Sequence, residues 1–218
     1  MQFFSQYKQD EILYNEVFGK NKGYFCEVGA HNGVKFSNTL FYEKHLNWNG
    51  ICIEPLPDAF KSLKNNRKCI VKEGAAYNRT GTIKFIQCNG GIEMLSGIKE
   101  TYGDQHSNRL EKEKQSSHQT SKEIDVSCFM LKNLFNEHKV DTVDYLSIDT
   151  EGSEYEVLLG IDFDKVKVNV VEIEVNYPDN EKHRSIISLL NSKGFQKWKK
   201  IVIDEIYIST NPCYSWQK

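Results

Sequence analysis

The chain has 218 residues, 39% of them hydrophobic and 27% charged, with a formal net charge of −2. This length suffices for one domain with a full core, and the near-neutral charge excludes a strong electrostatic attraction to nucleic acid or to a membrane surface. No apolar run approaches the roughly 20 residues of a membrane span, and the first ten residues lack the pattern of a secretory signal. We therefore expect a single cytoplasmic domain over residues 1–218.

Apolar runs alternate with helix-like segments along the chain. The expected strands are 23–28, 50–54, 69–75, 143–149 and 168–175. The expected helices are 35–46, 56–66, 128–138, 153–159 and 181–193. Residues 195–210 hold two further apolar runs, which predict an antiparallel pair at the sheet edge that ends in an antiparallel C-terminal edge strand. The alternation predicts an α/β fold with a Rossmann-like, doubly wound and mostly parallel sheet.

Residues 88–121 interrupt this alternation. They are rich in Gly, Ser, Gln, Lys and Glu. An insertion of this length inside a compact domain is usually either a functional lid or a disordered loop. We expect a flap on the substrate side of the domain; the alternative, for residues 107–121 above all, is a solvated loop without a role.

The six cysteines predict neither a disulfide framework nor a zinc site. No two of them form a Cys-x-x-Cys pair, and none belongs to a Cys/His cluster with zinc spacing. Those inside apolar runs are expected to be small core residues in a reducing compartment. The six are Cys26, Cys52, Cys69, Cys88, Cys128 and Cys213.

Residues 24–33 read Tyr-Phe-Cys-Glu-Val-Gly-Ala-His-Asn-Gly, an apolar run that ends in an acid and a glycine turn. Such a turn lets the backbone approach a ligand closely. A second apolar run ends in Glu54, about 20 residues further on, where α/β nucleotide sites hold ribose hydroxyls. The pair predicts a nucleoside pocket at the carboxyl ends of two strands. The alternative is an ordinary strand–helix turn followed by a surface glutamate.

The glycine spacing narrows the choice of ligand. A dinucleotide fingerprint that starts at Gly29 needs glycine at positions 31 and 34, where the chain has His31 and Val34. The sequence also lacks the Gly-Lys-Ser/Thr of a phosphate loop. The turn therefore favours a nucleoside without phosphates, of which S-adenosylmethionine is the commonest.

A second group of acids follows the expected strand 143–149. Asp149, Glu151 and Glu154 crowd one turn, where like charges raise one another's pKa and cost stability. Helix N-terminal capping explains Glu154, because acids favour that end of a helix. It explains Asp149 poorly, so we expect Asp149 to face the ligand crevice.

The next expected strand ends in Glu172-Ile-Glu-Val-Asn176, and its end should lie beside Asp149. Asp149, Glu174 and Asn176 offer a set of oxygen ligands that suits Mg²⁺ or Mn²⁺. The competing interpretation has no metal and uses one carboxylate as a base. The sequence leaves both open.

With these motifs the chain resembles the FkbM family of S-adenosylmethionine-dependent methyltransferases, over roughly residues 4–210. The resemblance rests on Ser5-Gln6 with Gln9-Asp10, Glu27 to Gly33, Ser37-Asn38-Thr39, Trp48 to Pro55, Asn66-Arg67, Ser96-Gly97, and Asp144 to Asp149 with Glu151-Gly152 and Glu154. The chain departs from the pattern at Glu27, where many members have Asp, and at His31, often Asn. His31 is therefore a poor candidate for an obligatory base.

The resemblance implies a Rossmann-like fold and S-adenosylmethionine-dependent methyl transfer to oxygen, on a hydroxyl of a sugar or glycan. It places Glu54 at the ribose and the end of the third strand near adenine. For Ser37, capping of the following helix is the alternative to a cofactor contact. By position it assigns cofactor contacts to Glu27, Gly29, Ala30, Asn32, Gly33, Ser37, Asn38, Thr39, Glu54, Pro55, Ala75 and Asp149.

An acceptor hydroxyl needs a positioned base or a metal ion, because it is weakly acidic at neutral pH. We expect Asp149 to serve in this role, supported by Glu151 and Glu174. Contacts to the substrate are expected from Gln6, Gln9, Ser96 and Tyr102. For the two glutamines, the alternative is the polar face of an amphipathic helix.

Two other functions stay open. One is methylation of a non-sugar small molecule or a protein, and the other is a non-catalytic nucleoside-binding domain. The retained acids at 27, 54 and 149 argue for an active enzyme. A nucleic-acid acceptor is not expected, because the sequence has no basic stripe.

Overall fold

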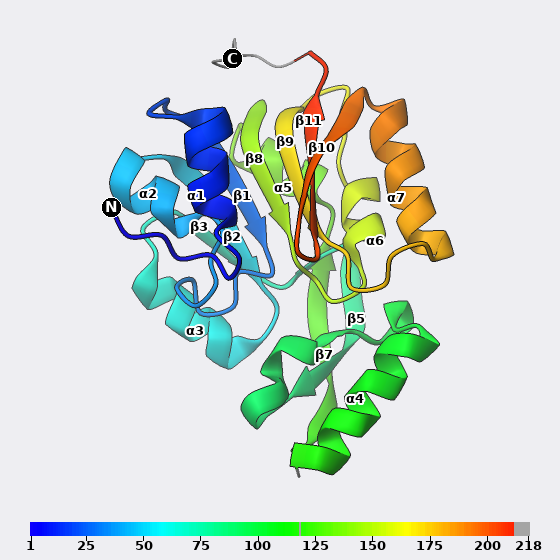
Figure 1. The fold of residues 1–218 in the computed structure, drawn as a ribbon. Helices are drawn as coiled ribbons and strands as arrows, with labels where there is room; N and C mark the ends of the chain where they lie inside the picture. The colour runs from blue at the N-terminus through cyan, green and yellow to red at the C-terminus, as the bar shows by residue number, and fades with distance from the viewer. Residues whose placement is uncertain (118, 212–218) are drawn as a thin grey trace.

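A seven-stranded sheet forms the centre of the protein (Figure 1). The computed structural model describes residues 1–117 and 119–211; Cys213 lies outside them. In chain order the strands of this sheet are β1 (Tyr24–Val28), β2 (Asn49–Glu54), β3 (Ile70–Glu73), β8 (Thr142–Ile148), β9 (Lys167–Glu174), β10 (Phe195–Ile201) and β11 (Asp204–Ser209). Their order across the sheet is β10-β11-β9-β8-β1-β2-β3.

The pairings confirm the expected mostly parallel α/β fold. β3, β2, β1, β8 and β9 are parallel neighbours, and their buried runs of Val, Ile and Leu are typical of strands covered on both faces. β10 and β11 form the expected antiparallel pair. The edge strand, however, is β10: β11 is antiparallel to both of its neighbours and lies between β10 and β9. Its residues at 204–207 are buried, which suits an interior strand.

Helices cover both faces of the sheet. One face packs against α5 (Leu131–Glu137), α6 (Glu154–Leu159) and α7 (Glu181–Ser192). The other packs against α1 (Gln9–Leu13), the π-helical turn η1 (Tyr14–Phe18), α2 (Leu40–Leu46) and α3 (Pro57–Asn66). Among the described residues, no helix is both long and apolar enough to cross a membrane.

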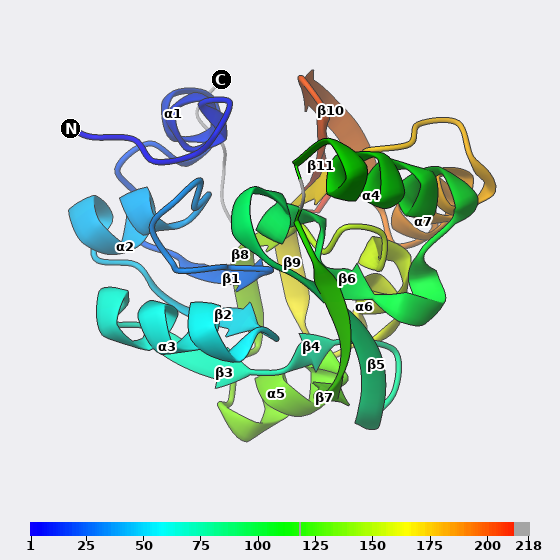
Figure 2. The ribbon, with the colours of Figure 1, turned by 90° about the horizontal axis from the view of Figure 1, so that it is seen from below.

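A second, smaller sheet lies beyond the carboxyl ends of the parallel strands (Figures 1 and 2). Its order is β4-β7-β5-β6. Its strands are β4 (Ala75–Ala76), β5 (Gly81–Cys88), β6 (Gly97–Ile98) and β7 (Ser121–Phe129), and it carries the short 3₁₀ helices η2 (Gly90–Leu95) and η3 (Lys99–Thr101) and the helix α4 (Asp104–Ser117). The region 88–121 is therefore largely helix and strand, and it belongs to a sheet that begins before it and ends after it.

Three expected boundaries were wrong, each for a local reason. The expected helix 35–46 begins only at Leu40, because residues 37–39 bond to Glu27 instead. The expected strand 69–75 ends at Glu73, since Gly74, at φ +126°, turns the chain into the second sheet. The expected helix 128–138 begins at Leu131, because residues 128–129 end β7.

Candidate functional site

A pocket opens where β1, β2 and β8 end, between the main sheet and the small sheet, and we call it the main pocket. Its lining combines strand ends with residues of η2 and the small sheet. The lining residues are Val28, Gly29, His31, Ile53, Glu54, Pro55, Leu56, Gly74, Ala75, Ala76, Phe85, Glu93, Met94, Ser96, Ile98, Asp149, Thr150, Glu151 and Ser153. The sheet therefore places its ligand site where the crevice of an open α/β fold is expected.

The turn after β1 requires glycine at position 29. Gly29 has φ +86°, and a Cβ there would lie 1.8 Å from the backbone oxygen of Asp149. The amides of Gly29 and Ala30 both donate to the carbonyl of Ile53, at 3.0 Å. The turn is therefore fixed between β2 and β8, and its backbone forms one wall of the main pocket.

Glu54 lines the same pocket with a carboxylate that backbone amides hold in place. One oxygen accepts from the amide of His31 at 2.7 Å, and the other accepts from the amide of Leu56 at 2.9 Å. Burial raises the pKa of Glu54 to about 7, although these two hydrogen bonds lower it. A carboxylate held this way is ready to accept hydrogen bonds from ligand hydroxyls.

A smaller side pocket adjoins the main one and shares Gly29, His31 and Asp149 with it. Glu27, Ala30, Ser37 and Asn38 are among its lining residues. The two pockets therefore meet at the glycine turn and at Asp149.

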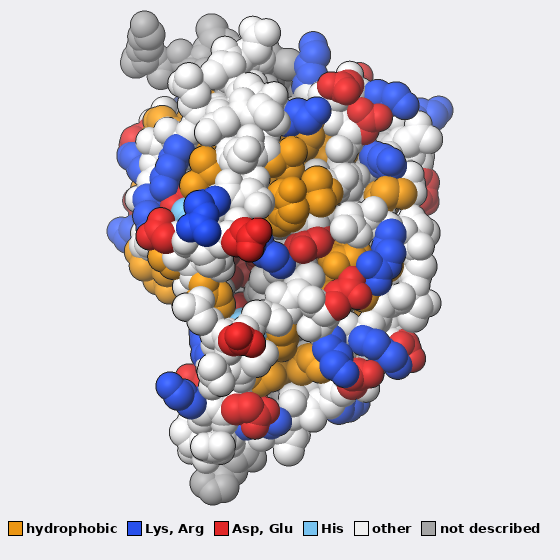
Figure 3. Space-filling model, turned by 90° about the vertical axis from the view of Figure 1, so that its right-hand side faces the viewer, with side chains coloured by type: hydrophobic (Ala, Val, Ile, Leu, Met, Phe, Trp, Pro, Cys, Tyr) orange, Lys and Arg blue, Asp and Glu red, His pale blue; other side chains and the backbone are white. Residues whose placement is uncertain are grey.

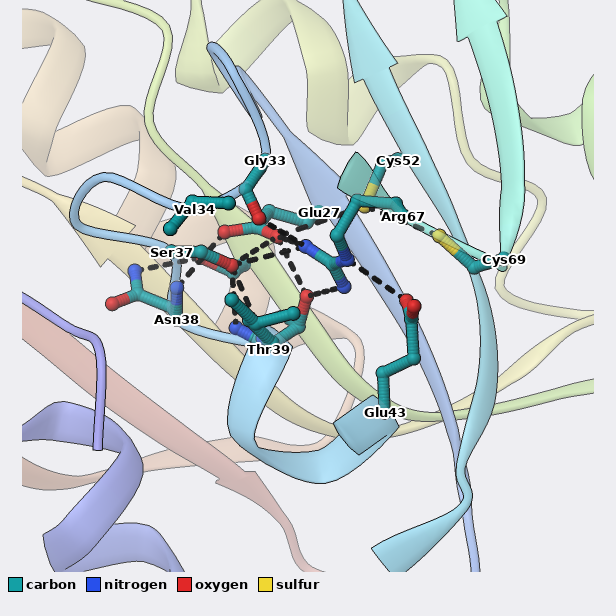
Figure 4. Close-up of polar contacts among 12 residues, drawn as sticks. Glu27, Gly33, Val34, Ser37, Asn38, Thr39, Glu43, Cys52, Arg67 and Cys69 are labelled. Carbon is teal, nitrogen blue, oxygen red and sulfur yellow. Dashed lines mark hydrogen bonds and ion pairs between the residues drawn. The ribbon is translucent and has the colours of Figure 1, made fainter. Parts of the chain in front are cut away.

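Glu27 is buried beneath this turn and is occupied by protein groups (Figure 4). One of its oxygens accepts from Ser37 Oγ at 2.9 Å and Thr39 Oγ1 at 2.6 Å, and the other from the Asn38 amide at 2.9 Å. Arg67 Nη1 lies 3.0 Å from the same carboxylate. The Glu27 carboxylate therefore fixes the conformation of residues 37–39 through these hydrogen bonds.

Arg67 is the cation of this network, and its guanidinium lies in the middle of the group in Figure 4. Its side chain is fully buried and also pairs with Glu43 at 2.8 Å. Further hydrogen bonds reach the carbonyl of Gly33 and the hydroxyls of Ser37 and Thr39. Arg67 thus ties α2 and the end of α3 to the segment that carries the glycine turn.

Asp149, Glu151 and Glu174 form an acidic cluster at the ends of β8 and β9. One carboxylate oxygen from each lies within 4.8 Å of the others. Glu151 adopts a left-handed backbone at φ 55°. Asn176 donates its amide to Glu174 at 2.6 Å and to Glu151 at 3.1 Å. Three of the expected active-site acids therefore do lie together, with Asn176 as their hydrogen-bond donor.

Burial dominates the electrostatics of this cluster. The pKa of Asp149 rises to about 7: burial raises it, a hydrogen bond with Glu174 lowers it, and nearby acids, Asp204 foremost, raise it. Burial and the neighbouring carboxylates raise the pKa of Glu151 and of Glu174 well above the usual range. The cluster therefore favours the protonated form of its carboxyl groups more than exposed acids do.

The residues expected to bind the cofactor divide into three groups. Gly29, Glu54, Pro55, Ala75 and Asp149 line the main pocket. Glu27, Ala30, Ser37 and Asn38 reach the side pocket. The rest line neither pocket and shape the turn behind them: Asn32 caps residues 34 and 35, Gly33 bonds to Arg67, and Thr39 bonds to Glu27.

The residues expected to contact the substrate are more dispersed. Ser96 lines the main pocket. Gln6 is exposed, and Gln9 is buried with its amide on Asp204 at 2.7 Å, so neither lines the two pockets. Tyr102 donates to the carbonyl of Leu95 and packs its ring against His106 at 4.1 Å.

Most of the apolar lining of the main pocket was not expected from the sequence. Leu56, Phe85, Met94 and Ile98 line the main pocket, and three of them come from the second sheet or η2. The only sequence signal was the mixture of glycines with apolar residues at 90–102, which marked the segment without assigning any contact.

The chain is similar to known proteins both in sequence and in structure. The model of the "Methyltransferase FkbM domain" family matches residues 27–197, and no curated protein matches the chain. A crystal structure of methyltransferase FkbM from Methylobacillus flagellatus KT is similar, at 13% identity and a TM-score of 0.48, covering 86% of this chain and 43% of that one. A precorrin-6y C5,15-methyltransferase from Geobacter metallireducens GS-15 is similar at 10% identity and a TM-score of 0.43. The match covers 91% of this chain and 85% of that one.

The chain thus spans less than half the length of the FkbM structure it resembles. A methyltransferase from Pyrococcus furiosus is similar at 15% identity and a TM-score of 0.41, covering 91% of this chain and 78% of that one. The family match extends from Glu27 of β1 into β10, and so takes in the glycine turn, Glu54, the acidic cluster and the small sheet. The chain belongs to the FkbM family of methyltransferases.

Proposed function

We propose that this protein is an S-adenosylmethionine-dependent O-methyltransferase that acts on a hydroxyl of a sugar or glycan. The observation that carries the proposal is the main pocket, where the Gly29 turn, the Glu54 carboxylate, Ala75 and Asp149 stand at neighbouring strand ends. Membership of the FkbM family supports the reaction class.

The chemistry of the pocket fits this cofactor. The described lining includes no Lys or Arg, which a phosphate-bearing nucleotide would need, and it includes the carboxyl groups of Glu54, Glu93, Asp149 and Glu151. Acidic walls suit the positive charge of a sulfonium and an amino group. Apolar side chains at Leu56, Phe85 and Ile98 provide a surface for a flat base. When bound, S-adenosylmethionine supplies the methyl group.

The residues of the chain then have to orient the acceptor and remove its proton. Asp149 is the base in this proposal, because it lies where the two pockets meet and its pKa is about 7, near the working pH. The acceptor hydroxyl gives its proton to the Asp149 carboxylate as the methyl group is transferred. Glu174, hydrogen-bonded to Asp149, and Glu151 orient the hydroxyls of the acceptor.

A sugar acceptor follows from the resemblance and from the density of hydrogen-bond acceptors around Asp149. On the face drawn in Figure 3, basic side chains are interspersed with acidic ones, which argues against a nucleic-acid surface there. The five described cysteines are all free thiols, in keeping with our proposal of a cytoplasmic location. Non-sugar and protein acceptors are the alternatives that the test below includes.

The test combines binding with turnover. Calorimetry with S-adenosylmethionine and S-adenosylhomocysteine should show micromolar binding, and a panel of sugar, small-molecule and peptide acceptors should yield a product heavier by one methylene in mass spectrometry. Asp149→Asn should keep cofactor binding and lose most turnover, whereas Glu137→Gln, exposed on α5, should keep both. Absence of cofactor binding would refute the proposal; turnover only on peptides would replace the acceptor.

A further inference from the structure

The acidic cluster faces a histidine from the small-sheet side of the molecule. His106 of α4 is 3% exposed, and its Nδ1 lies 3.8 Å from Glu151 Oε2, too far for a hydrogen bond. Nδ1 is buried and has no hydrogen-bond partner. A buried ring nitrogen of this kind costs free energy unless something bonds to it.

The hydrogen bond of the other ring nitrogen, Nε2, determines that Nδ1 is the atom able to bind a ligand. Nε2 lies 3.2 Å from the carbonyl of Leu95, so it carries the proton and donates it there. Nδ1 then presents a lone pair toward Glu151. Metal-binding histidines usually have this arrangement, with one nitrogen on a backbone carbonyl and the other on the metal. The ring of Tyr102, 4.1 Å away, packs against the imidazole and fixes its orientation.

The carboxylates provide the remaining ligands. The oxygens of Asp149, Glu151 and Glu174 lie within 4.8 Å of one another. Side-chain shifts of about half an ångström would bring the three oxygens to bonding distance of one small divalent ion. His106 Nδ1 does not lie within 4.8 Å of all three, so the imidazole must also move toward the ion. The neighbouring cation, Arg109, lies 3.9 Å from Glu151 and is half exposed.

We propose that His106, Asp149, Glu151 and Glu174 form a binding site for a divalent first-row transition metal ion. The ion is of the Mn²⁺ or Fe²⁺ type, because an imidazole beside three carboxylates favours these over Mg²⁺. This set differs from the ligands expected from the sequence, which were Asp149, Glu174 and Asn176. Asn176 is not a ligand here, because its amide donates hydrogen bonds to Glu151 and Glu174 and orients them.

In the proposed site α4 supplies one ligand, and residues at the ends of β8 and β9 supply the other three. His106 comes from the segment 88–121, and the metal would join that segment to the ends of β8 and β9. With the ion bound, Asp149 would be one of its ligands, and the ion rather than a free Asp149 carboxylate would assist removal of the acceptor proton; this role rests on the proposed function, whereas metal binding itself does not.

The test uses Mn²⁺ and the full chain, stripped of metal and without S-adenosylmethionine. Electron paramagnetic resonance should show one saturable site, with Mg²⁺ competing at least about tenfold less well. Pulsed spectra of bound Mn²⁺ should show coupling to a nitrogen nucleus, which His106→Asn removes. Glu151→Gln should weaken Mn²⁺ binding at least about tenfold. Glu137→Gln, at an exposed residue, and His138→Asn, at a partly buried one, are matched controls away from the acidic cluster.

Three results would overturn the proposal: no saturable Mn²⁺ binding, bound Mn²⁺ without nitrogen coupling in the unaltered chain, or unchanged affinity in Glu151→Gln. The nitrogen coupling is measured on the unaltered protein, so the test holds even if His106→Asn folds poorly. A parallel titration with S-adenosylmethionine separates the two proposals. Cofactor binding without Mn²⁺ binding would remove the metal site alone, and the reverse would remove the methyltransferase proposal alone.

Discussion

Replacing Arg67 with methionine tests whether the buried ion network supports the glycine turn. The Arg67 side chain is fully buried, while those of Glu27 and Glu43 are 6% and 10% exposed. Its guanidinium donates hydrogen bonds to five groups: Glu43, Glu27, the Gly33 carbonyl, Ser37 and Thr39. Methionine keeps much of the volume and removes the charge and all five donors.

The expected loss is large because two carboxylates lose their cation in a buried place. Removing one partner of a buried pair costs about 3–5 kcal/mol, out of a total stability of about 5–15 kcal/mol. A domain of this size loses about 2–4 °C in melting temperature per kcal/mol, so we expect a decrease of about 10 °C. The loss should be smaller at pH 5 than at pH 8, because Arg67 lowers the pKa of Glu43, and once this cation is removed burial favours the protonated carboxyl.

Urea unfolding followed by circular dichroism measures the effect at both pH values. Arg79→Met is the matched control, since Arg79 pairs with Glu100 at the surface and both side chains are about half exposed, at 50% and 45%. It should have a far smaller effect. Equal destabilisation by the two substitutions, or an Arg67→Met loss below about 1 kcal/mol, would contradict the reasoning.

Three further predictions concern the pockets. Gly29→Ala should strongly lower the melting temperature, because its Cβ would meet Asp149 at 1.8 Å, whereas Gly103→Ala, with open space, should not; similar melting temperatures would refute this. Glu54→Gln should weaken S-adenosylmethionine binding about tenfold in calorimetry, and unchanged affinity would exclude a ribose contact. Asp149→Asn should stabilise the protein more at pH 8 than at pH 4, by up to about 4 kcal/mol in urea unfolding.

The sign of the last prediction follows from the pKa of Asp149, which rises from 3.8 to about 7 on folding. The folded chain holds this proton more tightly than the unfolded chain does. Its contribution to stability is therefore complete below pH 4 and is lost as the pH rises toward 7. Asparagine cannot ionise, so its advantage should appear within this range; a difference that is independent of pH would contradict the raised pKa.

The strands of the main sheet were predictable because each of them is marked by a short run of apolar residues in the sequence. The runs of β1, β2, β8 and β9 are apolar and β-branched, and each ends within about two residues of its expected position. The small sheet was missed because β5 and β7 alternate buried and exposed positions, and so their runs carry many polar residues. Their stability comes from pairing with each other across more than 30 residues, which no short window of sequence reveals.

The site residues also divide into those that local sequence patterns predict and those whose positions depend on distant contacts. Glu54 and Asp149 were predictable because a strand end is a local feature. Glu27 was expected to meet the cofactor, and no local pattern indicated that Arg67, 40 positions away, bonds to its carboxylate. The position of His106 was equally unpredictable, because its approach to Glu151 depends on how α4 packs against η2.

The interior position of β11 determines when the main sheet can close during synthesis. β10 precedes β11 in the chain, yet within the described sheet it pairs with β11 alone, so it must wait for residues 204–209. The bond between Gln9 and Asp204, at 2.7 Å, joins positions 195 residues apart. Contacts this distant slow folding. A nascent chain that lacks β11 leaves one side of β9 unpaired, and we expect that exposed edge to be the point at which the growing chain depends most on chaperones.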